Sequence, residues 1–121
     1  MILWVSTDAQ NYMLTRSLDD DGIETILNKR IFIDFNGSEV QIYTKGKNSE
    51  IPITAERYST FIISDVTKEI IEEEEYIGYT LRHIESRSDK YYVLSVLELP
   101  KNQVLIALYS GDDIIVLKGY R

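Results

Sequence analysis

The feature that most constrains the fold is a β-hairpin signal near the middle of the first half. Two runs rich in β-branched and aromatic residues, Arg30–Phe35 and Val40–Thr44, flank the pair Asn36-Gly37. Such a pair tolerates the positive φ angles that a tight hairpin turn requires. We therefore predict two antiparallel strands here, followed by a short edge strand at Glu50–Ile53.

A long helix is predicted next, from about residue 55 to about residue 72. Thr54 can cap its N-terminus, and Glu56 is favourably placed in its first turn. Its apolar residues recur at spacings of three and four, at Tyr58, Phe61, Ile62, Val66 and Ile70, with Ile63 widening the stripe. The β-branched residues around Ile62 would also suit a strand.

Four β-rich runs separated by turn residues follow Glu75: Tyr76–Ile84, Tyr91–Glu98, Val104–Tyr109 and Ile114–Lys118. Strands this close in sequence can be joined only by hairpins, which predicts an antiparallel meander. The run Val104–Leu108 is apolar on both faces, so we expect a helix or another subunit to cover part of this sheet.

The first thirty residues are less regular. Met1–Ser6 is typical of a strand, Asp8–Leu18 suits either a short helix or a second strand, and Asp19–Gly22 predicts a turn. At 121 residues the chain is expected to form one domain. The predicted fold class is α+β, with an N-terminal strand, antiparallel strands in residues 30–53 and 76–118, and one helix between these groups.

Charge is the main compositional signal. The net charge is −7; residues 1–75 carry 7 Lys+Arg against 15 Asp+Glu (−8), and residues 76–121 carry 6 against 5 (+1). No apolar run approaches the roughly 18 residues of a membrane span, and the N-terminus lacks the pattern of a signal peptide. With no cysteine, we expect neither disulfides nor thiolate metal sites, and a cytoplasmic location.

The residue sets of common catalytic sites are missing. The sequence has no Gly-x-Ser-x-Gly elbow, no glycine-rich phosphate loop and no calcium-loop spacing of aspartates. The single histidine, His83, shares strand parity with Ile77, Tyr79 and Leu81, which favours a core or rim position. We expect a protein without enzymatic activity, metal or cofactor.

The candidate binding residues are acidic. Glu72, Glu73, Glu74 and Glu75 are consecutive, and they are either a solvated connector or a docking patch for lysines and arginines. Tyr76 follows them and could add aromatic contact area. Five aspartates are weaker candidates for the same docking role, because aspartate is common in turns. They are Asp19, Asp20, Asp21, Asp112 and Asp113.

The order of elements from Lys29 to about Glu73 resembles the strand–strand–strand–strand–helix unit of Whirly and PUR-alpha proteins. That resemblance implies curved antiparallel sheets packed on helices and binding of single-stranded nucleic acid. The −8 charge of residues 1–75 departs from the basic surface such binding needs.

In size, acidity and lack of catalytic motifs the chain also resembles immunity proteins of bacterial toxin systems. This resemblance implies an inhibitor that binds one basic protein partner, a toxin such as a nuclease, and occludes its active-site cleft. The alternatives are a single-stranded nucleic-acid-binding module of the Whirly type and a small ligand-binding or enzymatic subunit. The sequence does not indicate an oligomeric state.

The charge predicts that the isolated protein has no useful affinity for single-stranded DNA or RNA at physiological salt, because phosphate contacts dominate such binding. Fluorescence anisotropy with labelled oligonucleotides at about 150 mM salt measures this. Submicromolar binding would favour the Whirly-type function over the inhibitor.

Overall fold

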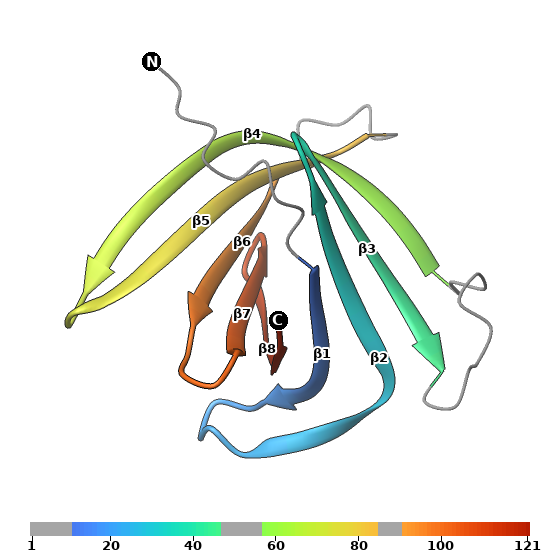
Figure 1. Cartoon of the computed structure of the whole chain (residues 1–121). Coiled ribbons are helices and arrows are strands. Elements are labelled where there is room, and N and C mark those ends of the chain that lie inside the picture. The colour runs from blue at the N-terminus through green and yellow to red at the C-terminus, as the bar shows by residue number, and fades with distance from the viewer. Residues whose placement is uncertain (1–10, 47–56, 85–90) are drawn as a thin grey trace.

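The computed structural model describes residues 11–46, 57–84 and 91–121, and these form an all-β closed barrel. Each strand is antiparallel to its neighbours, in the order β1 to β8 around the barrel (Figure 1). The strands are β1 Asn11–Leu18, β2 Glu24–Asn36, β3 Glu39–Gly46, β4 Arg57–Ile71, β5 Glu74–His83, β6 Tyr91–Glu98, β7 Gln103–Ser110 and β8 Asp113–Tyr120.

The barrel closes where β1 pairs with β8. Leu14 lies opposite Gly119 on β8 and opposite Ile31 on β2, so β1 has a neighbour on each side. In such a meander, successive turns lie at alternate ends of the barrel. The β1–β2 and β7–β8 turns are therefore at one end, and the β2–β3, β4–β5 and β6–β7 turns are at the other.

Alternate residues of the strands point inward and fill the barrel, as the two-residue period of a strand requires. The buried core comprises Tyr12, Leu14, Ile33, Phe35, Val40, Phe61, Leu81, Leu94, Val96, Val104, Ile106 and Leu117. Phe35 joins three strands, because its ring meets Tyr12 edge-on at 5.9 Å and lies 4.7 Å from the ring of Tyr79. Apolar burial of this kind is the main stabilising contribution to the fold.

Several predicted elements are confirmed. The first hairpin turns at Gly37-Ser38, and Gly37 has a φ of 62°, which fits the first central position of a type II′ turn. The predicted meander is present as β5 to β8. Residues 11–18 form a strand, which resolves the choice left open for the N-terminal region, and the turn predicted at Asp19–Gly22 connects β1 to β2. The strands predicted at Met1–Ser6 and Glu50–Ile53 lie outside the described residues.

The α+β prediction is wrong, because the segment predicted as a helix from about 55 to 72 is the strand β4. Seven of its fifteen residues are β-branched, and such side chains pack well on a pleated surface. The strand pairs with β3 on one side and β5 on the other, so tertiary pairing decided its conformation. The helix implied by the Whirly resemblance is thus absent from this segment.

A β-bulge accounts for part of the helix-like spacing in β4. The register with β5 shifts between Ile63 and Asp65, so one extra residue interrupts the alternation. The face of β4 that carries the inward residues Phe61 and Ile63 then continues with Val66, which lies opposite the core-packed Tyr79 but is 44% exposed. The bulge changes the spacing between Ile63 and Val66 from two to three, which is one of the spacings read as helical, whereas Ile62 belongs to the opposite face of the strand from Phe61.

The cover expected for the apolar run in β7 is not a helix in the part of the chain that the structure describes. Val104 and Ile106 point into the core, whereas Leu105 and Ala107 lie on the outer face and are only partly exposed. The outer face of β7 is therefore apolar without a covering layer among the described elements.

Gly119 makes the closure possible, and its substitution tests it. A Cβ at this position would collide with the backbone carbonyl of Met13 and approach Leu14 Cα to 2.6 Å. Gly119→Ala should therefore lower the free energy of unfolding by about 1–3 kcal/mol, because β1 must move away from β8. Urea denaturation measures this.

Gly78→Ala is the matched control, since its Cβ would meet a side-chain atom, Thr67 Oγ1 at 2.8 Å, which can move aside. We expect a change within about 0.5 kcal/mol for this variant. Equal stability of the two variants would contradict the tight contact between β1 and β8.

Candidate functional site

The four glutamates predicted as a docking patch form the tip of the β4–β5 hairpin. β4 has 15 residues and β5 has 10, and β4 continues from Ile62 to Ile71 after its last pair with β3, so the paired ends of β4 and β5 project from the barrel wall (Figure 1). Glu72 and Glu73 make the two-residue turn, and Glu74 and Glu75 begin β5. The run is therefore neither the end of a helix nor a long connector, but a projecting acidic tip.

The β4–β5 turn has a left-handed backbone, as does the β6–β7 turn, where Lys101 and Asn102 have φ angles of 62° and 60°. Glu72 and Glu73 have φ angles of 52° and 70°, in the left-handed region where glycine and asparagine are favoured. Both central residues of a type I′ hairpin turn need positive φ, and Asn-Gly is the preferred pair. Non-glycine residues in sparsely populated regions cost on the order of 1–3 kcal/mol each. The protein carries this strain at the most acidic point of its sequence.

Two cations neutralise part of the surrounding charge. Lys68 on β4 lies 3.1 Å from Glu75, and Arg121 lies 2.9 Å from Glu98 on β6. Within the described residues, no ion pair or hydrogen bond is found for the side chains of Glu72 and Glu73. Their carboxylates are exposed and available to a cationic partner.

Pairing between β5 and β6 brings Glu98 beside the glutamate run. Tyr76 lies opposite Leu97, so Glu98 is close to the start of β5. A hollow of about 400 Å³ is lined by Glu73, Glu74, Glu75, Ile77, Val96, Leu97 and Glu98. Sequence reasoning missed Glu98, and no local signal marks it, because it is far from Glu75 in the sequence and only the strand pairing brings them together.

Glu98 also acts on the barrel interior. Burial, and after it the negative charge of Glu98, raises the pKa of both Tyr12 and Tyr79. Both effects favour the neutral phenol. The two tyrosines inside the barrel that feel the charge of Glu98 therefore stay uncharged.

The predicted aspartates lie at the other end of the barrel. Asp19, Asp20 and Asp21 belong to the β1–β2 turn, and Asp112 and Asp113 lie at the β7–β8 turn. The Asp19 carboxylate accepts hydrogen bonds from the backbone N–H groups of Asp21 (3.0 Å) and Ile23 (2.8 Å). It is thus used to form the turn, and the structure does not bring the aspartates together with the glutamates.

Tyr76 and His83 occupy opposite faces of β5. Tyr76 is on the outer face, opposite Glu69 on β4 and Leu97 on β6. His83 lies inside the barrel rim, where its ring meets Phe61 edge-on at 5.2 Å. The predicted core-facing position of His83 is confirmed.

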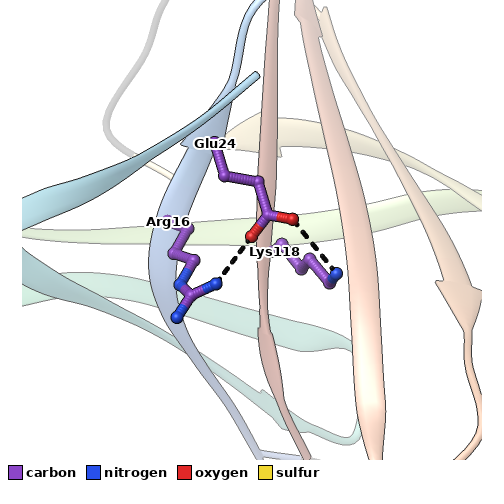
Figure 2. Close-up of polar contacts among 3 residues, drawn as sticks. All are labelled: Arg16, Glu24 and Lys118. Carbon is purple, nitrogen blue, oxygen red and sulfur yellow. Dashed lines mark hydrogen bonds and ion pairs between the residues drawn. The ribbon is translucent and has the colours of Figure 1, made fainter. Parts of the chain in front are cut away.

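A second charged cluster, shown in Figure 2, lies on the outside of the barrel seam. Glu24 on β2 accepts a hydrogen bond from Arg16 on β1 at 2.9 Å and one from Lys118 on β8 at 3.4 Å. The hydrogen bond from Arg16 is the main cause that lowers the pKa of the Glu24 carboxyl. Because the group joins three strands across the closure and its charges pair with one another, we assign it a structural role.

The described residues contain no group of three or more His, Cys, Asp or Glu side chains arranged to hold a metal ion. The same part of the chain has no helix that could cross a membrane. No protein-family model, curated protein or solved structure matches the sequence or the fold.

The strained turn can be tested by replacement with the favoured pair. Glu72→Asn combined with Glu73→Gly should raise the free energy of unfolding by roughly 1–3 kcal/mol, because both residues adopt positive φ readily. Glu72→Gln with Glu73→Gln is the control, since it removes the same charges and keeps the backbone strain. If urea denaturation shows equal gains for both variants, charge repulsion and not backbone conformation limits the stability of the turn.

Proposed function

We propose that this protein is an inhibitor that binds one basic protein partner through the tip of its β4–β5 hairpin. The observation that carries the proposal is the pair Glu72-Glu73, exposed at the end of the longest hairpin in a backbone conformation that glutamate disfavours. Strain of this kind is retained where a function requires it. A glycine or asparagine would form the same turn more easily but would not provide the charge.

The partner best suited to this tip has a concave basic surface. A nuclease cleft is basic because it binds phosphates, and a projecting acidic hairpin can enter it and exclude the nucleic acid. The glutamates would then occupy positions that phosphates take in the substrate complex. An immunity protein that neutralises a nuclease toxin is the function of this class that we propose.

The overall charge supports fast capture of such a partner. A net charge of −7 attracts a basic protein over a distance of about 8–10 Å at physiological ionic strength. Complementary charges raise association rates, and lost rim charges reduce them. Speed matters for an inhibitor that must bind a toxin before the toxin acts.

The test replaces Glu72, Glu73, Glu74 and Glu75 by glutamine. The partner is first captured from the source cells by crosslinking, purified, and assayed for nuclease activity with and without the inhibitor. The variant should associate more slowly and with a flatter salt dependence, and it should lose on the order of 1–3 kcal/mol of binding free energy if contacts are desolvated. Surface plasmon resonance at two salt concentrations measures these changes.

The matched control replaces Asp20, Asp21, Asp112 and Asp113 by asparagine, which removes four charges at the other end of the barrel. This control should change the association rate much less than the glutamine variant. An equal effect of both variants would indicate only long-range attraction. A larger effect of the control would place the interface at the aspartate end, and a partner without nuclease activity would overturn the function of nuclease immunity protein.

A further inference from the structure

Next to the acidic hairpin, the outer wall of the barrel carries an apolar groove. It has a volume of about 280 Å³ and is lined by Glu69, Ile71, Tyr76, Ser95, Leu97, Leu105, Ala107 and Tyr109, from strands β4 to β7. All of these side chains point away from the core, because their neighbours in each strand, such as Val96 and Ile106, point into it. The groove is thus separate from the barrel interior.

Leu97 shows that the groove is a formed feature of the surface. Its side chain is only 6% exposed, yet it does not belong to the core cluster. It is covered from the outside by its cross-strand neighbours, Tyr76 on β5 and Leu105 on β7. The outer face of the sheet therefore holds a small second apolar cluster, which the groove leaves open to solvent.

Apolar exposure continues from the groove along one row across the sheet. Val93, Tyr109 and Ile114 lie opposite one another on β6, β7 and β8, and they are 39%, 40% and 50% exposed. A contiguous exposed apolar surface on a soluble protein is a mark of a docking site. The polar rim on the hairpin side consists of Glu69 and, beyond it, the glutamate tip.

We propose that this groove receives apolar side chains from a basic segment of the partner that the glutamate hairpin binds. The inference rests on the proposed function, and it adds that the partner presents leucine-like side chains flanked by lysine or arginine. The apolar side chains would cover Leu97, Leu105 and Ala107. The flanking cations would pair with Glu69 and with the glutamates of the tip.

Charge and size favour this occupant over others. A second copy of the chain would bring two net charges of −7 together, and these charges repel one another. The groove is open along one side and its volume of about 280 Å³ is at the small end of ligand sites, which suits one or two side chains of a partner. Glu69 is the single carboxylate in the lining, and it favours a partner segment that has a lysine or arginine next to its apolar side chains.

Two short synthetic peptides serve as probes, one alternating lysine with leucine and the other alternating lysine with serine. Both are titrated into the isotope-labelled protein and followed by NMR. We expect the lysine–leucine peptide to shift the amide resonances of Leu97, Leu105 and Ala107, and to bind about tenfold more tightly than the lysine–serine peptide. The lysine–serine peptide should shift only the resonances of the hairpin tip.

Two variants locate the binding. Ala107→Trp fills the groove, and Glu69→Lys reverses the charge at its exposed rim. Each variant should lower the affinity for the lysine–leucine peptide about tenfold. Ala107→Trp should leave the affinity for the lysine–serine peptide unchanged. Asp65→Lys is the matched control for the rim, because it makes the same charge change on the same outer face of β4. Glu69→Lys keeps the test valid if Ala107→Trp fails to fold.

The outcomes separate the two proposals. If replacing Glu72–Glu75 by glutamine weakens the binding of both peptides and Ala107→Trp weakens the binding of neither, the groove proposal is overturned. The acidic hairpin then remains a docking site. If the groove variants weaken the binding of the lysine–leucine peptide, and replacing the hairpin glutamates by glutamine weakens the binding of neither peptide, the hairpin proposal fails. The groove then remains a docking site. If neither peptide binds, or if Asp65→Lys acts as strongly as Glu69→Lys, the groove proposal is overturned.

Discussion

The architecture depends on the close approach of β1 and β8. Gly119 has no side chain, so the backbone of β1 at Met13 and Leu14 can pack directly against it and complete the hydrogen-bonded circle. Closure pairs β1 with β8 and so removes the two edges that an open sheet would have there, whereas β4 beyond Ile62 is paired only with β5 among the described residues. Outside the same seam, Glu24 joins Arg16 and Lys118 and holds three strands together.

Closure also determines where binding can occur. With the interior occupied by core side chains, the surfaces left for a partner are the strand-connecting ends and the outer wall. The β4–β5 hairpin uses both, because its glutamate tip extends past the barrel end and its outer face borders the apolar groove. An acidic tip beside an apolar groove suits a basic partner that also presents apolar side chains.

The candidate site was predicted only in part. Glu72–Glu75 and Tyr76 stand out as a consecutive run, and the structure places them together on one hairpin. Strand pairing brings Glu98, Leu97 and Leu105 next to this run. These residues are far from the run in the sequence, so their proximity could not be predicted. Asp19 was grouped with the glutamates by charge, but its carboxylate satisfies backbone N–H groups in a turn at the other end.

Local chemistry determined the first hairpin, the meander of β5 to β8 and the turns between them, because Gly37 and the β-branched runs have few alternatives. Only tertiary structure decided the conformation of β4. Its apolar residues lie on both faces of the strand, and the bulge at Ser64 changes one spacing from two to three, so the sequence pattern could be read as helical. The barrel itself also required long-range pairing, since nothing near Leu14 in sequence indicates that Gly119 will lie beside it.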